Sequence, residues 1–125
     1  MKKIFLYILL SFLISSISFA KKSGCTQGDC NNGIGIWTYT DKTTYNGEWV
    51  NGSKNGKGVE MWPNGYVYDG EFKDSKWHGN GTLKFPDGST YKGGWKDNKM
   101  HGKGTLSSFG GNIKEGVWNE GDYVK

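Results

Sequence analysis

Three stretches decide the fold: Tyr45-Asn-Gly-Glu-Trp49, Tyr68-Asp-Gly-Glu-Phe72 and Tyr91-Lys-Gly-Gly-Trp95, each starting 23 residues after the one before. A Gly-x-Gly pair follows each stretch at the same spacing, without an insertion. A fixed period of this length is typical of a repeat architecture. The glycines that define the repeat are Gly47, Gly56, Gly58, Gly70, Gly79, Gly81, Gly93, Gly102, Gly104 and Gly116.

Each unit has the pattern of a β-hairpin. Tyr45, Gly47 and Trp49 alternate with polar residues, which is the period of a strand. Short polar pairs such as Asn51-Gly52 then provide a tight turn, and Pro63-Asn64-Gly65 closes the second strand. The next units repeat these turns at Asp74-Ser75, Asp97-Asn98 and Pro86-Asp87-Gly88. We therefore predict an all-β fold, a single-layer antiparallel meander of 23-residue hairpins that forms an elongated, solenoid-like sheet.

Alternation gives this sheet one aromatic face and one face rich in lysine and acids. The Gly-x-Gly pairs leave room for the rings of the neighbouring strand to lie over the backbone. This face has two interpretations: it is the core of the solenoid, or it binds sugars, lipid head groups or the side chains of a partner. The candidate residues are Trp37, Tyr45, Trp49, Trp62, Tyr68, Phe72, Phe85, Tyr91, Trp95 and Trp118.

The three stretches and their Gly-x-Gly pairs closely resemble the MORN (membrane occupation and recognition nexus) repeat, as do His78-Gly-Asn-Gly81 and His101-Gly-Lys-Gly104. The resemblance covers roughly Cys25 to Tyr123. It implies complete repeats at 45–67, 68–90 and 91–113, between half-repeats at 25–44 and 114–125. MORN-family proteins are associated with membrane targeting and protein assembly, so the resemblance implies one or both roles here.

The first twenty residues differ from the rest. Lys2 and Lys3 precede an uncharged apolar run, and Ser18-Phe19-Ala20 ends it with the small residues that a signal peptidase accepts. We predict a signal peptide at 1–20, a short linker at 21–24, and an exported protein of the periplasm or cell envelope. An uncleaved membrane anchor is the alternative, because the apolar run is at the lower limit for spanning a bilayer.

Cys25 and Cys30 are the two cysteines of the chain. In an exported protein their spacing predicts a disulfide across a tight turn. A lipidated Cys25 is the alternative, although Lys22 does not suit a lipidation signal. A metal site is disfavoured, because two cysteines without a nearby histidine are an incomplete ligand set.

Charge and motifs exclude several functions. Beyond Ala20 the chain has 14 lysines, no arginine and 12 acidic residues. The absence of arginine weighs against specific nucleic-acid recognition. No nucleophile elbow, phosphate loop or pair of catalytic carboxylates is present, so we expect no enzyme and no cofactor. His78 and His101 recur at one position of the repeat and are interpreted as turn residues, since about 10 Å would separate them.

Glu60 differs from the residues at the same position of the later repeats, which are Leu83 and Leu106. An acid among rings could be a functional carboxylate. The favoured interpretation is that it lies near the sheet edge and stays solvated or pairs with a lysine. We expect an interaction module that contacts a protein, or itself, through the aromatic and glycine face. Peripheral binding to an anionic lipid or envelope surface through lysines is the alternative, and a carbohydrate-binding module or degraded enzyme is a third.

Overall fold

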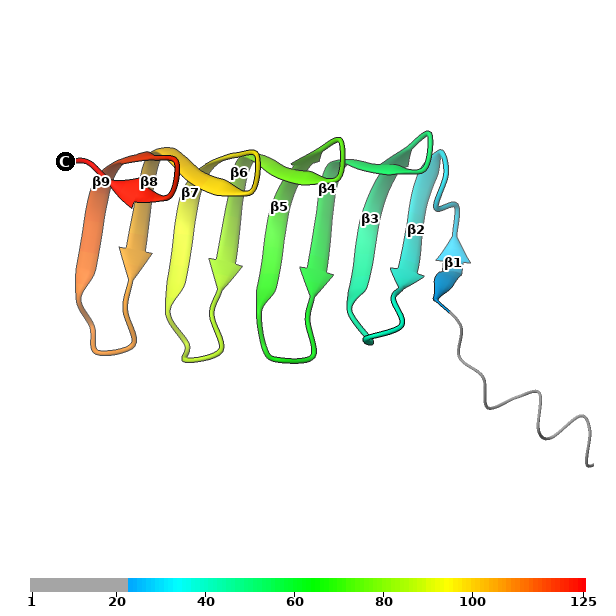
Figure 1. The fold of residues 1–125 in the computed structure, drawn as a ribbon, viewed down its shortest axis with the longest axis horizontal. Helices are drawn as coiled ribbons and strands as arrows, with labels where there is room; N and C mark the ends of the chain where they lie inside the picture. The colour runs from blue at the N-terminus through cyan, green and yellow to red at the C-terminus, as the bar shows by residue number, and fades with distance from the viewer. Residues whose placement is uncertain (1–22) are drawn as a thin grey trace, which may run out of the picture.

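The computed structural model describes residues 23–125, which form one open sheet of ten antiparallel strands in sequence order (Figure 1). This confirms the predicted all-β meander. The strands are β1 (Gly24–Gly28), β2 (Gly33–Thr38), β3 (Thr44–Val50), β4 (Ser53–Met61), β5 (Val67–Lys73), β6 (Lys76–Lys84), β7 (Thr90–Lys96), β8 (Lys99–Ser107), β9 (Ile113–Asn119) and β10 (Asp122–Tyr123). In this part of the chain no helix is long and apolar enough to cross a membrane. The predicted signal peptide lies outside the described residues.

Two-residue turns join the strands along one long edge of the sheet, the upper edge in Figure 1. Both residues of each turn have positive φ, for example 49° at Asn51 and 75° at Gly52, which matches the right-handed twist of a hairpin. Each turn also bonds to the hairpin before it. The amide of Ser75 donates to the carbonyl of Lys54 at 2.9 Å, and the amide of Asn98 donates to that of Trp77 at 3.1 Å. Successive hairpins are therefore held to one another at this edge.

Longer turns form the opposite edge. The amide of Gly65 donates to the carbonyl of Trp62 at 3.1 Å, and the amide of Gly88 donates to that of Phe85 at 3.0 Å. Trp62 and Phe85 therefore begin the turns, whereas the alternation of the sequence makes them the last residues of strands. The tyrosine and tryptophan columns form one continuous core between the two edges.

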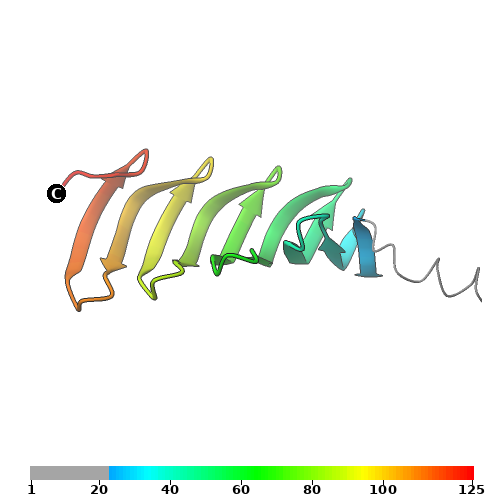
Figure 2. The same cartoon turned by 60° about the horizontal axis from the view of Figure 1, so that its bottom comes forward.

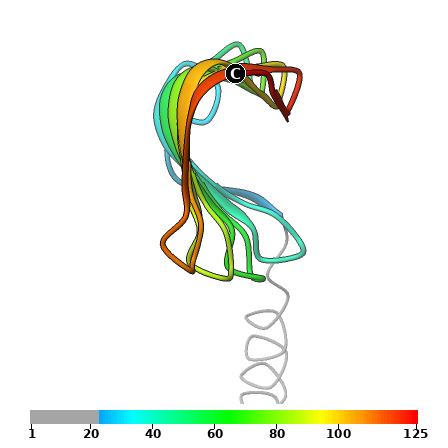
Figure 3. The same cartoon turned by 90° about the vertical axis from the view of Figure 1, so that its left-hand side faces the viewer.

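The strands curve along their length and nest behind one another, as the views in Figure 2 and Figure 3 show. This curvature brings side chains of one face together, so a single layer can cover its own aromatic core. Both ends of the array are closed by extra segments. At one end β1 pairs with β2, and at the other the amide of Val117 donates to the carbonyl of Lys125 at 2.8 Å. β1 begins inside the predicted linker at 21–24.

The disulfide between Cys25 and Cys30 is present, as the sequence predicts. It lies at the end of the aromatic core, where Cys30 packs against the buried rings. A Cβ added to Gly35 would be 2.8 Å from Cys30 Sγ. The disulfide thus covers Gly35, beside which no tyrosine ring lies. Because Cys25 is bonded to Cys30, it is not free for lipidation.

Candidate functional site

A row of glycines crosses the sheet at mid-strand. The register pairs one glycine with the next from β2 to β9, so that the row is unbroken along the array. Its members are Gly35, Gly47, Gly58, Gly70, Gly81, Gly93, Gly104 and Gly116. Because glycine has no side chain, the row leaves space above the backbone on both faces of the sheet. What occupies this space differs between the two faces.

On the aromatic face the space holds tyrosine rings. A Cβ on Gly58 would be 2.6 Å from Cζ of Tyr45, and one on Gly81 would be 2.6 Å from Cζ of Tyr68. The hydroxyl of Tyr68 then donates to the carbonyl of Glu71 at 2.8 Å. Tyr45, Tyr68 and Tyr91 are each 0% exposed. Burial raises the pKa of all three phenols above the ordinary value near 10.

The first glycine of each Gly-x-Gly pair has another role. Gly56, Gly79 and Gly102 have φ of 87°, 71° and 78°, which a side chain disfavours. They lie in bulges, where the register between paired strands shifts by two residues. At the second bulge the carboxylate of Glu71 accepts a hydrogen bond from the amide of Asn80 at 2.6 Å. The sequence pattern did not single out this glutamate, although Glu48 stands at the same position one repeat earlier and accepts a hydrogen bond from the amide of Lys57.

The tryptophan column is tied to the same glycines. Indole Nε1 of Trp95 donates to the carbonyl of Gly81 at 3.0 Å, and Trp49 and Trp118 make the equivalent bonds to Gly35 and Gly104. Of the ten candidate aromatic residues, seven are buried. Trp37, Trp62 and Phe85 are partly buried and pack against them. The aromatic columns are therefore mainly the core. Of the ten candidate rings, only these three are partly accessible to a partner.

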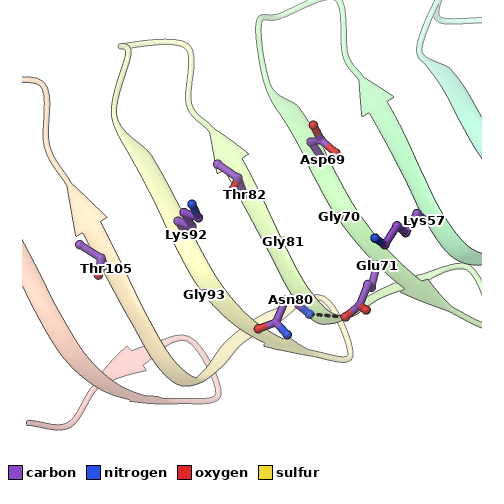
Figure 4. A pocket seen from close by; sticks show the side chains of 10 residues that line it. All are labelled: Lys57, Asp69, Gly70, Glu71, Asn80, Gly81, Thr82, Lys92, Gly93 and Thr105. Carbon is purple, nitrogen blue, oxygen red and sulfur yellow. Dashed lines mark hydrogen bonds between the residues drawn. The ribbon is translucent and has the colours of Figure 1, made fainter.

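On the polar face the same row forms the floor of a groove of about 750 Å³ (Figure 4), which we call the polar groove. It runs across strands β4 to β8. Gly70, Gly81 and Gly93 lie on its floor, and its polar walls are Lys57, Asp69, Glu71, Asn80, Thr82, Lys92 and Thr105. A smaller cavity between Lys103 and Val117 continues along the row. The walls carry both charges: Lys57 lies opposite Glu71, and Asp69 and Lys92 lie on either side of Thr82. The groove therefore suits an extended polar ligand of mixed charge.

A second charged feature lies on the edge with the tight turns. Lys73 pairs directly with Lys76 across one hairpin, and Lys96 pairs with Lys99 across the next. All four side chains are exposed. Like charges in directly opposed positions repel, so this lysine edge favours the approach of an anion.

The structure corrects two interpretations of single residues. Glu60 is the second-last residue of β4, an inner strand, and only 6% exposed, so it does not stay in solvent. It pairs with Lys54, which is the other predicted outcome. His78 and His101 are not in the turns: each is the third residue of its strand, β6 and β8. Among residues 23–125 no three histidine, cysteine, aspartate or glutamate side chains are grouped to hold a metal ion.

Comparison of the chain with known protein families agrees with this geometry. The MORN repeat family matches residues 45–65, 68–90 and 91–113, which is more than half of the chain. The three matches begin at Tyr45, Tyr68 and Tyr91, the buried tyrosines that cover the glycine row. No curated protein is significantly similar to the chain.

Proposed function

The chain belongs to the MORN-repeat family, and we propose that it is a non-catalytic interaction module that binds another protein, or a second copy of itself. The family supports an interaction role in general. The polar groove supports protein contact in particular, because it is long, open and lined by both charges. Residues 23–125 carry twelve lysines and twelve acidic residues, so the array as a whole has no excess of positive charge.

The burial of the aromatic columns shapes this proposal. The tyrosines and most tryptophans are covered within the chain, so a partner is not required to shield them. Contact through the aromatic face is limited to partly buried side chains, among them Trp37, Trp62 and Phe85. The polar groove is the more extensive accessible surface, and a polypeptide that lies along it would cross several strands and meet lysine and carboxylate groups in turn.

A photo-crosslinker placed in the groove tests the proposal. Thr82→p-benzoylphenylalanine puts the reactive group in the groove wall. Asp87→p-benzoylphenylalanine, in an exposed turn of the same repeat, is the control. Irradiation of producing cells should give a discrete protein adduct at position 82 and none at 87. An adduct of twice the chain's mass identifies self-association, and the absence of any adduct at 82 rejects protein contact through the groove.

Export to the cell envelope is part of the proposal and rests on the leader sequence alone. The test is the intact mass of the protein from the envelope fraction. This mass should be that of a chain that begins at Lys21. A retained leader would indicate a membrane anchor instead.

The second candidate function is peripheral binding to an anionic lipid or envelope surface, which the lysine edge favours. Replacing Lys73, Lys76, Lys96 and Lys99 by glutamine should abolish sedimentation with phosphatidylglycerol vesicles in low salt. Replacing Lys42, Lys84, Lys114 and Lys125 removes the same charge elsewhere and is the matched control. Binding through the edge should also fall steeply as salt rises, because exposed charges are screened. Equal loss in both variants would indicate attraction without a defined surface.

A further inference from the structure

The ion pair of Lys54 and Glu60 is the point at which the first complete repeat departs from the later ones. At the equivalent positions the second repeat has Trp77 and Leu83, and the third has Met100 and Leu106. The two charged side chains are only 11% and 8% exposed. The later repeats fold with apolar residues in this place, so the architecture does not require the charges.

The pair lies between two cavities on the aromatic side of the sheet, away from the polar groove. The larger, of about 540 Å³, is lined by Trp37, Tyr39, Trp49 and Lys54 among others. The smaller, of about 260 Å³, shares Tyr39 and Lys54 and adds Glu60 and further residues of the turn. The larger cavity is within the range of about 300–1,000 Å³ that holds small ligands, and the smaller is just below it.

Polar groups with unused bonding capacity face these cavities. Asp41 is exposed at the smaller one, and its carboxylate accepts a hydrogen bond from the amide of Thr43 at 2.8 Å, which leaves further acceptor sites. The ammonium of Lys54 bonds to one oxygen of Glu60 and lies 5.2–5.8 Å from the ring centres of Tyr39, Tyr45 and Phe72, so it has further donors. These charged groups beside the cavities favour a ligand that carries donors and acceptors.

Flat apolar walls complete the site. The partly buried rings of Tyr39 and Trp62 border the smaller cavity, and Trp37 borders the larger. Asp41 adds a second carboxylate, so the smaller cavity has two negative charges and one positive charge. That balance disfavours an anion. A purely apolar ligand would cover Asp41 and the Lys54–Glu60 pair without offering them hydrogen bonds.

We propose that this cleft binds a neutral pyranose sugar. The C–H face of a pyranose ring packs on Trp62 or Trp37, while its hydroxyls bond to Glu60, Lys54 and Asp41. One ligand thus contacts the apolar rings and the polar groups of the cleft together. The site is on the opposite face from the polar groove, so this proposal does not depend on the proposed function.

Calorimetric titration of the purified protein with cellotetraose and chitotetraose tests this site. At least one sugar should bind, and Trp62→Ala should weaken that binding roughly tenfold or more, as expected for an aromatic anchor. The matched control is Phe85→Ala, which removes the equivalent ring one repeat later, where no ion pair is present. It should change the dissociation constant by less than about twofold.

A second variant separates binding from folding. Lys54→Met with Glu60→Leu gives the first repeat the residues of the third, so the fold should keep its melting temperature while sugar binding is lost. Sugar binding that survives this double change would overturn the proposal. So would the absence of heat with both sugars, equal loss in the Trp62 and Phe85 variants, or binding of inorganic phosphate or propylammonium in their place.

Discussion

At the scale of single residues, the second position of each Gly-x-Gly pair requires glycine because a tyrosine ring lies directly over its backbone. A Cβ at Gly81 would approach Tyr68 closer than van der Waals contact allows. Gly81→Val should therefore lower the free energy of unfolding by about 1–3 kcal/mol or more, because the buried ring has no space to move into. Urea unfolding should show a clearly lower midpoint.

Lys84→Val is the control, since Lys84 is exposed on the polar face of the same strand. Valine suits a strand, so this change should stay within about 0.5 kcal/mol of the parent. Equal midpoints for the two variants would show that the glycine does not serve as the floor of the ring.

The buried tyrosines predict a specific response to alkaline pH. Burial raises the pKa of Tyr45, Tyr68 and Tyr91, so the folded state keeps phenol protons that the unfolded chain loses above pH 10. Stability is thus full below pH 10 and falls as pH rises beyond it, by about 1.4 kcal/mol at pH 11 for each of Tyr45 and Tyr68, and Tyr91 adds a loss in the same direction. Urea unfolding at pH 8 and 11 measures the loss. Tyr68→Phe should reduce it by the share of one tyrosine, and an unchanged midpoint at pH 11 would contradict the assignment.

At the scale of elements, the disulfide is a local staple at the end of the sheet. It closes a short ring in front of β2, and its sulfur covers Gly35. Cys25→Ser with Cys30→Ser should cost about 2 kcal/mol or less. Amide exchange should accelerate in β1 and β2 and stay unchanged in β5 to β8, as it should after reduction of the parent protein. Loss of protection in the central strands would mean that the disulfide supports the whole array.

Strands, turns and faces could be predicted because a fixed period repeats the same chemistry. The two-residue turns and the alternation in Tyr45-Asn-Gly-Glu-Trp49 each have a direct local cause. The bulges could not be predicted, because Gly56 and Gly58 look alike in sequence and only the backbone shows that they differ. The burial of the rings also depends on the curvature of the sheet, which no single repeat specifies. The Lys54–Glu60 pair did leave a signal, since both residues break columns that are apolar in the later repeats.

At the scale of the whole molecule, the array is a one-dimensional stack in which each hairpin bonds only to its neighbours. In such a stack, stability grows with the number of internal interfaces. Inserting a second copy of residues 68–90 after Thr90 adds one complete hairpin and one interface, and leaves both closing ends in place. The extended protein should therefore unfold at a higher urea concentration and with a steeper transition, because more surface becomes exposed on unfolding.

The control for this insertion is a copy with one residue fewer, 68–89. Side chains alternate between the faces with a period of two, so losing one residue turns every following aromatic residue toward the polar face. It also breaks the glycine row, which depends on Gly70, Gly81 and Gly93 meeting in register. This shorter insertion should yield a protein that is less stable than the parent or unfolded. If both insertions were equally stable, the continuous tyrosine and glycine columns would not be what holds the array together.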